Sequence, residues 1–321
     1  LSRNYIGEPF STSTLEDLTI GEKVTTIRGG AFGSCKLVSV TIPSSVTSIG
    51  GNAFNYKLEE IVFENGDADL SLDRPLFPSI NTIYLGRPIS SSSTFSFSSL
   101  ANLNTLYVTN TYLSDALFAN CSALETVFFN ENLETISPNA FKNCISINHV
   151  EFPNSLKTIG ANAFEGCTSI NTLDIPEGVT SIGEYAFSGC KNLSSVQIGE
   201  GLQTIGSYSF KDCSLLSSIT VPSTVNSIGD NPMPSNKYIH FRSTVPVPVF
   251  QISLPCVLFV PNNAVADYKT AWPDYSMYIV GESDFIEKAY NITAQESTSA
   301  LLEAIGENNT FSVVKLKVSG T

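Results

Sequence analysis

Apolar residues recur through the centre of this chain at intervals of 23 positions. Three ladders keep this period, and each is made of one residue type: Phe118, Phe141, Phe164, Phe187 and Phe210; Cys121, Cys144, Cys167, Cys190 and Cys213; Ile136, Ile159, Ile182, Ile205 and Ile228. Chance does not align three independent ladders over four or more periods, so the chain is built from repeats.

One repeat in the middle of the chain shows how a unit folds. Leu173 and Ile175 alternate with polar Thr172 and Asp174, which is the pattern of a strand with one buried face. Pro176 lacks an N–H group and ends that strand. A single unit is too short to enclose a core, whereas stacked units can, because each covers the apolar edge of its neighbour.

The same pair of inward residues recurs along the chain and predicts about a dozen coils of 21–23 residues. The pairs are Leu18/Ile20, Val40/Ile42, Ile61/Phe63, Ile83/Leu85, Leu106/Val108, Val127/Phe129, Val150/Phe152, Leu173/Ile175, Val196/Ile198 and Ile219/Val221, with weaker matches at Ile239/Phe241 and Leu258/Val260. The predicted fold is a strand-rich repeat solenoid of the α/β type.

The consensus of these units, C-x-x-L-x-x-I-x-I-P-x-x-V-x-x-I-G-x-x-A-F, resembles the BspA-like leucine-rich repeats of bacterial surface proteins, especially those of Bacteroides-type organisms. The resemblance covers roughly residues 15–278. It implies a right-handed leucine-rich-repeat superhelix with caps at both ends. It also implies adhesion or protein–protein contact, with a host extracellular matrix protein or a host glycan as the partner.

The pattern divides the chain into four predicted segments: an N-terminal cap (1–14), the solenoid (15–260, irregular at 64–120 and 229–250), a C-terminal capping helix (261–278) and an extension (279–321). Val265, Tyr268 and Trp272 share one face of the capping helix, so Trp272 is expected to cover the last coil. The extension has a helical pattern at 299–305 and a strand pattern at 311–318, and we interpret it as the start of a further domain.

Five of the seven cysteines occupy one repeat position. Because neighbouring coils lie about 4.8 Å apart, stacked cysteines have nearly parallel Cα–Cβ vectors. That geometry suits a ladder of small buried thiols and not the crossed geometry of disulfides. Cys35 occupies the same position in an earlier coil, and Cys256 precedes the last predicted strand.

Catalytic chemistry finds no support in the motifs. His149 and His240 are the only histidines and lie about four coils apart, so they cannot share a metal site. The chain lacks G-x-S-x-G, G-x-x-x-x-G-K-[ST] and H-E-x-x-H. We therefore predict a non-enzymatic protein with no catalytic residues, no metal and no cofactor.

Composition narrows the partners. With 17 Lys and Arg against 30 Asp and Glu, the formal charge is −13, which disfavours nucleic acid and anionic membrane as ligands. The longest apolar runs are strand-sized, so no direct membrane insertion is expected. The acidic balance suits an exposed monomer. The resemblance to bacterial surface proteins implies a location at the cell surface or outside the cell, with anchoring to the outer membrane through a segment that this chain does not contain.

Most residues that the repeat turns outward are small and polar, with one exception. Tyr84, Tyr107 and Phe128 fall in a row on successive coils, and His149 and Glu151 lie on the next coil. Such a row can anchor a protein partner or stack on a sugar. Alternatively, the rings pack on one another and stabilise the sheet, or the loop 64–80 or 86–101 folds over them.

Two classes of function follow from this surface. The first is a secreted or cell-surface module for adhesion or protein–protein interaction that binds through the exposed sheet. The second is a structural spacer or scaffold within a larger surface protein, which the long run of outward Ser and Thr favours. A glycan-binding module is a further alternative.

Overall fold

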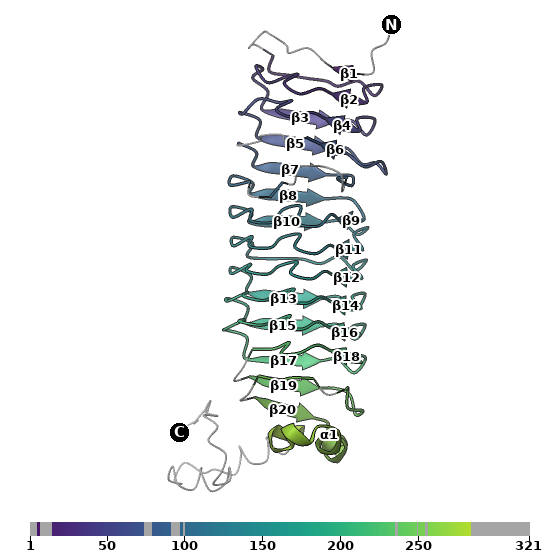
Figure 1. Ribbon diagram of the computed structural model, residues 1–321, viewed down its shortest axis with the longest axis vertical. Helices are drawn as coiled ribbons and strands as arrows, with labels where there is room; N and C mark the ends of the chain where they lie inside the picture. Colours follow the sequence, from purple (N-terminus) through teal and green to yellow (C-terminus); the bar gives the residue numbers. More distant parts are fainter. Residues whose placement is uncertain are drawn as a thin grey trace, which may run out of the picture.

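The computed structural model describes residues 5–6, 15–73, 79–90, 97–98, 100–234, 237–248, 250–253 and 256–283. These residues form a long stack of coils that runs along one axis from the N-terminal to the C-terminal end (Figure 1). The stack has about 11 turns and confirms the strand-rich solenoid predicted from the repeats.

Coils contribute four-residue strands to a column along the stack (Figure 1). The ten described strands are β3 (Ser39–Ile42), β5 (Glu60–Phe63), β7 (Thr82–Leu85), β8 (Thr105–Val108), β10 (Thr126–Phe129), β13 (Thr172–Ile175), β15 (Ser195–Ile198), β17 (Ser218–Val221), β19 (Tyr238–Phe241) and β20 (Val257–Val260). The column consists of three parallel sheets, β3-β5-β7-β8-β10, β13-β15 and β17-β19-β20-β21, and β21 is Ile279–Gly281.

A second column holds shorter, two-residue strands that also pair in parallel. They are β1 (Tyr5–Ile6), β2 (Thr26–Ile27), β4 (Ser48–Ile49), β6 (Ser71–Leu72), β9 (Tyr112–Leu113), β11 (Thr135–Ile136), β12 (Thr158–Ile159), β14 (Ser181–Ile182), β16 (Thr204–Ile205) and β18 (Ser227–Ile228). The isoleucine ladder predicted from the sequence supplies the buried residue in several of these strands.

Burial alternates along the long strands, as the sequence pattern predicts. In β13, Thr172 and Asp174 are exposed whereas Leu173 and Ile175 are buried. The first and third residues of the long strands from β3 to β19 therefore form an outward surface. We call this surface, together with the equivalent residues 149 and 151, the sheet face. The second and fourth residues supply one wall of the core.

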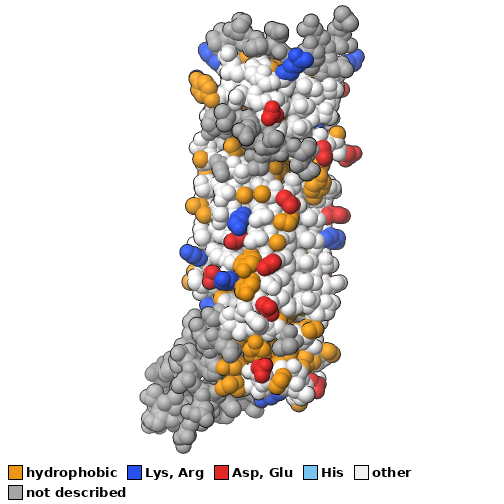
Figure 2. Space-filling model, in the orientation of Figure 1, with side chains coloured by type: hydrophobic (Ala, Val, Ile, Leu, Met, Phe, Trp, Pro, Cys, Tyr) orange, Lys and Arg blue, Asp and Glu red, His pale blue; other side chains and the backbone are white. Residues whose placement is uncertain are grey.

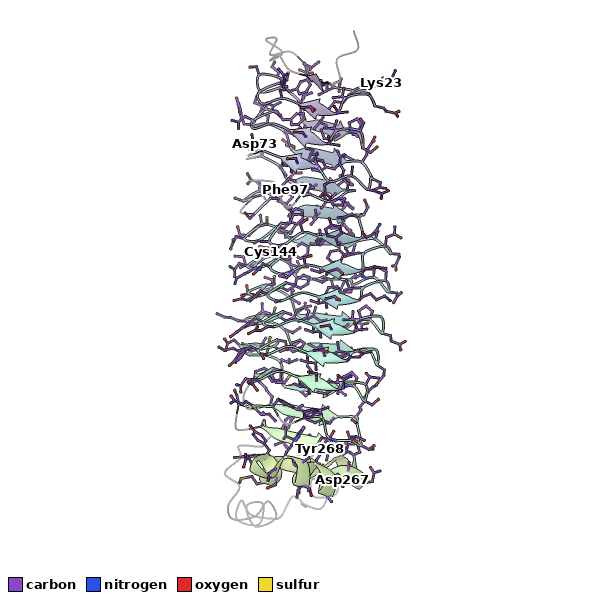
Figure 3. The ribbon with its side chains drawn as sticks, turned by 45° about the vertical axis from the view of Figure 1, so that its right-hand side comes forward. Lys23, Asp73, Phe97, Cys144, Asp267 and Tyr268 are labelled. Carbon is purple, nitrogen blue, oxygen red and sulfur yellow. The ribbon has the colours of Figure 1, made fainter. Side chains whose placement is uncertain are left out.

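Phenylalanine rings fill the core opposite the sheet. Phe118, Phe141, Phe164, Phe187 and Phe210 stack between successive coils, with centroids 5.3–6.0 Å apart. The stack extends one coil further than the sequence ladder, because Phe97 lies on Phe118 with centroids 5.4 Å apart. Figure 3 labels Phe97 inside the coil stack. The core thus stays continuous where the repeat pattern weakens.

The cysteine ladder adds a second link between coils. All seven cysteines are buried and none is in a disulfide, which confirms the prediction of buried thiols. Cys144 donates to the carbonyl of Phe118 and Cys167 to that of Phe141, both with S–O distances of 3.1 Å. Each thiol therefore bonds to the coil before its own. Burial raises the pKa of Cys167 to about 12, so the thiol stays protonated and remains a donor.

A glycine follows four of the five ladder isoleucines, from Ile159 to Ile228, and lets neighbouring coils approach closely. At Gly183, a Cβ atom would lie 2.4 Å from the backbone nitrogen of Ala161 in the preceding coil. The same backbone–backbone crowding meets a Cβ at Gly206, 2.5 Å from the nitrogen of Glu184. The glycines in the I-G pairs are therefore required by close approach of coils.

Two arginines each link a coil to the second coil before it. Arg87 is fully buried and donates to the carbonyls of Ser44 and Pro43 over 2.9 and 3.1 Å. Burial, partly opposed by nearby Glu64, lowers the pKa of Arg87 to about 10. Arg242 makes an ion pair with Glu200 on the surface. Both contacts couple coils that do not touch through the strand ladder.

Two predicted strands are wrong. Leu18 and Ile20 pack against the core but lie outside any strand. Val150 and Phe152 alternate with exposed residues as predicted, yet 149–152 form no strand, and the column of long strands in Figure 1 passes from β10 to β13 without an arrow. Phe152 nevertheless packs between Phe129 and Phe164 of the neighbouring coils, with centroids 6.3 and 5.7 Å away.

Helices close the C-terminal end of the described stack (Figure 1). They are η1 (Asn262–Ala264), α1 (Val265–Ala271) and η2 (Pro273–Tyr278). Trp272 follows α1, is buried, and contacts the rings of Phe241 and Phe250 edge-on. Its indole N–H donates to the carbonyl of Val247 over 3.0 Å. Trp272 therefore covers the apolar end of the last coils.

The four-segment division stays a prediction. Most of 1–14 and all of 284–321, including the predicted helix at 299–305 and strand at 311–318, lie outside the described residues.

Candidate binding surface on the sheet face

Tyr84, Tyr107 and Phe128, which we call the aromatic row, lie side by side on the sheet face. The parallel register pairs Tyr84 with Tyr107 and Tyr107 with Phe128. The centroids of the two tyrosine rings are 4.3 Å apart with planes 2° apart, and those of Tyr107 and Phe128 are 4.7 Å apart at 13°. The structure thus brings together the three aromatic residues that the repeat spacing predicts.

Stacking leaves the three rings unequally accessible. Tyr84 and Tyr107 are half-buried, and Phe128 is 48% exposed. Inside the aromatic row, each ring covers the facing side of the next ring. Solvent therefore contacts mainly the edges and the hydroxyl groups of the rings inside the row. The face of Phe128 turned away from Tyr107 is different because the aromatic row ends at this ring. Ring packing and surface exposure therefore coexist in the row.

Electrostatics around the aromatic row are weakly acidic. Burial, followed by the neighbouring Tyr107 and Glu60, raises the pKa of the Tyr84 phenol. The phenol is therefore neutral at ordinary pH, and its hydroxyl group can donate or accept a hydrogen bond.

His149 and Glu151 lie on the next coil, as predicted, but not on a strand. Nε2 of His149 lies 3.2 Å from Oε1 of Glu151, and their side chains are 62% and 86% exposed. At the column position that follows Phe128, the aromatic row is therefore succeeded by an exposed carboxylate. The two residues add polar groups to the end of the row without forming a buried site.

Between β13 and β17 the sheet face is small and polar, whereas β19 turns Tyr238 and His240 outward. From β13 onward the sheet face presents Thr172 and Asp174, then Ser195 and Gln197. In the view of Figure 2, neutral atoms dominate the surface, and charged side chains are scattered. The aromatic row is the main departure from this composition on the sheet face between β3 and β17.

Other chemistry has little structural basis. Within the described ranges, no group of three or more His, Cys, Asp or Glu side chains is arranged to hold a metal ion. A search of the same part of the chain for a helix long and apolar enough to cross a membrane finds none.

A second aromatic pair was missed by the sequence analysis. Tyr185 and Tyr208 stack with centroids 4.9 Å apart on the turns that follow β14 and β16. Both have positive φ, 53° and 57°, a region that costs a bulky residue about 1–3 kcal/mol. Asn162, which tolerates this conformation better, fills the same position in the preceding coil. The replacement of Asn by Tyr at one repeat position was the signal that could have revealed the pair.

The repeats match a known family over most of the chain. The profile described as a BspA type leucine rich repeat region in six copies matches residues 5–125, 76–171 and 111–240. The chain belongs to the BspA-type leucine-rich repeat family. This family consists of non-catalytic repeat proteins that serve as protein-interaction or scaffold modules.

Solved structures with related coils come from several bacteria. A leucine rich cell surface protein from Faecalibacterium prausnitzii is 18% identical over 96% of this chain and 91% of its own, with a TM-score of 0.33. The leucine rich repeat protein of T. pallidum is 25% identical over 67% of this chain and 79% of its own, with a TM-score of 0.31. A leucine-rich repeat protein from Bacteroides ovatus is 21% identical over 80% and 87%, with a TM-score of 0.31. No curated protein matches the chain.

Proposed function

We propose that this chain is a cell-surface or secreted module for protein–protein interaction or adhesion, and that it binds through the sheet face at the aromatic row. One observation carries the proposal: Phe128 is 48% exposed at the end of a three-ring stack, on a stretch of the sheet face from β3 to β17 whose other outward residues are mostly small and polar. Aromatic anchors held rigidly in this way are typical of the residues that dominate protein interfaces.

The proposed partner is an extracellular protein of a host, such as a matrix protein. A flat strand surface built on continuous coils is preorganised, so binding costs little ordering of the module itself. His149 and Glu151 supply polar contacts at one end of the row, and the hydroxyl groups of Tyr84 and Tyr107 supply them along it. The proposed location is outside the cell, with the anchor in another part of the protein.

Binding to a panel of immobilised host extracellular proteins and to a glycan array tests the proposal. The test variant is Tyr107→Ser with Phe128→Ser. The matched control is Ile145→Ser with Leu215→Ser, two apolar residues that are 47% and 57% exposed away from the aromatic row. Circular dichroism melting of both variants checks that the coils stay folded.

The expected result is at least a tenfold loss of affinity for a captured protein in the test variant alone, about 1.4 kcal/mol. Equal affinities of wild type and test variant would contradict the proposal. Binding on the glycan array alone, lost in the same variant, would make the row a glycan-binding site instead.

A spacer or scaffold is the second candidate, and the bland sheet face from β13 to β17 favours it. A rigid stack of coils with a continuous core keeps its ends apart at a fixed distance. This function predicts that no host protein or glycan binds and that shortening the stack by two whole coils changes only the reach of the assembled surface protein. Antibody labelling of intact cells tests the proposed location for both candidates.

A further inference from the structure

The aromatic row ends at a ring whose next neighbours in the same column are carboxylates. Phe128 covers Tyr107 with one ring face, and its other face is turned toward the next coil. The residue 23 positions later is Glu151, and 23 positions after that is Asp174 in β13, where it is exposed. Along this column, an aromatic surface therefore gives way to two successive carboxylates.

Charge on this part of the sheet face has one sign. Six segments hold the long strands from β5 to β15 with the residue before each, and a seventh is the equivalent non-strand stretch; they are 59–63, 81–85, 104–108, 125–129, 148–152, 171–175 and 194–198. They carry Glu59, Glu60, Glu125, Glu151 and Asp174 and contain no Lys or Arg. A partner surface that complements this region is cationic, because like charges across an interface oppose association.

Glu151 is open to such a partner. Its side chain is 86% exposed, and its Oε1 lies 3.2 Å from Nε2 of His149. The carboxylate therefore keeps acceptor sites open to solvent, at the repeat position that follows the 48% exposed Phe128. The absence of a strand at 149–152 leaves the Glu151 side chain in an irregular coil beside the end of the aromatic row.

We infer that the end of the aromatic row is a docking site for an arginine side chain of a protein partner, whose guanidinium stacks on Phe128 and pairs with Glu151. This inference rests on the proposed function and names the chemistry of its partner. A guanidinium is planar and weakly hydrated, so it continues a stack of rings and offers a carboxylate two parallel N–H donors. Asp174 on the following coil holds a second cation of the same partner segment.

Lysine fits this place less well. Its ammonium group is a compact, strongly hydrated charge that cannot continue a stack of planar rings or pair bidentately. A neutral aromatic side chain or a sugar would use Phe128 but leave the carboxylates without a partner. The site thus discriminates by shape as well as by charge.

The test uses the whole chain and two fluorescein-labelled peptides, Gly-Arg-Gly-Arg-Gly and Gly-Lys-Gly-Lys-Gly, in fluorescence polarisation at physiological salt. The peptides have equal charge and length, so nonspecific attraction to an acidic protein is the same for both. The arginine peptide is expected to bind at least about fivefold more tightly to the wild-type chain.

Four variants locate the binding. Glu151→Gln and Phe128→Leu are expected to remove the preference for arginine, whereas Phe128→Tyr keeps a ring and keeps the preference. Glu184→Gln removes one exposed charge on the turn after β14 and is expected to leave it unchanged. Thermal melting of Phe128→Leu confirms that the loss is not unfolding.

Equal binding of the two peptides, or a preference that survives Phe128→Leu, would overturn the inference. Its failure is distinguishable from failure of the proposed function. A host protein whose capture depends on Tyr107 and Phe128 but is insensitive to Glu151→Gln would support the function and refute the arginine site.

Discussion

Replacing Phe164 by Ala is the most direct test of the shared core. The ring is fully buried and lies between Phe141 and Phe187, with centroids 5.3 and 5.5 Å away, and meets Phe152 edge-on at 5.7 Å. A buried Phe→Ala change typically costs about 3–5 kcal/mol, and the lost aromatic pairs place this site toward the upper part of that range. We expect a loss of about 4 kcal/mol in the free energy of unfolding.

Urea unfolding measures the loss with two probes. Far-ultraviolet circular dichroism reports on all coils, whereas the fluorescence of Trp272, the single tryptophan, reports on the C-terminal end. Because core packing and strand pairing join each coil to its direct neighbours, the cavity weakens the stack at one place. We therefore expect the dichroism midpoint to fall more than the fluorescence midpoint.

Phe128→Ala is the matched control, because it removes the same side chain from the sheet face. Phe128 is 48% exposed and stacks on one ring only, so its loss is expected to cost about 1 kcal/mol. A cost below about 1 kcal/mol for Phe164→Ala, or equal costs at both positions, would refute a core shared by successive coils.

Three further outcomes follow from contacts between coils. Gly183→Ala is expected to lower the free energy of unfolding by more than about 1 kcal/mol in urea. Gly21→Ala is the control and is expected to be nearly neutral, because nothing lies within 4 Å of the added Cβ. Similar losses of stability in both variants would contradict the close approach of coils. Burial raises the pKa of the Cys167 thiol to about 12, so in the folded protein at pH 8 this thiol is expected not to react with Ellman's reagent. In guanidinium chloride the same thiol is expected to react. Fast reaction in the folded protein would show that the reagent reaches the cysteine ladder. The hydrogen bond from Arg242 lowers the pKa of Glu200, with weaker contributions from bonds to Ser223. The ionised Glu200 therefore stabilises the folded protein above pH ~4.3, the usual pKa of Glu, and this contribution is lost as the pH falls through the lower pKa of the folded state. Because both side chains are substantially exposed, Arg242→Gln is expected to lower the free energy of unfolding at pH 7 by less than about 1 kcal/mol. The same change is expected to make the free energy of unfolding fall less steeply as the pH is lowered. An unchanged acid dependence would refute the contribution of this ion pair to stability.

Local periodicity predicted most of the fold because each repeat position has one environment. Phe164 and Cys167 are buried, and Thr172 is exposed, as the ladders indicate. The row of Tyr84, Tyr107 and Phe128 could also be read from the sequence, because parallel coils in register place equivalent residues side by side. Its function as a binding surface stays a proposal.

Departures from the repeat were harder to predict. Phe97 continues the core without the sequence pattern that marks the other rings, and Val150 has the strand alternation without the strand. Tyr185 and Tyr208 look like ordinary surface residues until their positive φ and mutual stacking are known. In each case the deciding contact is made with another coil.

The amino-acid sequence alone determined the repeat, the inward and outward positions, and the identity of the ladder residues, since these depend on which side chains avoid water. Only the tertiary structure decided the spacing between coils and the hydrogen bonds of the thiols to the preceding coil. It also decided the gap in the sheet at 149–152 and the exposure of the Phe128 ring. Spacing reflects a balance between ladder hydrogen bonds and the packing of bulky side chains from neighbouring coils, and no single repeat contains both sides of that balance.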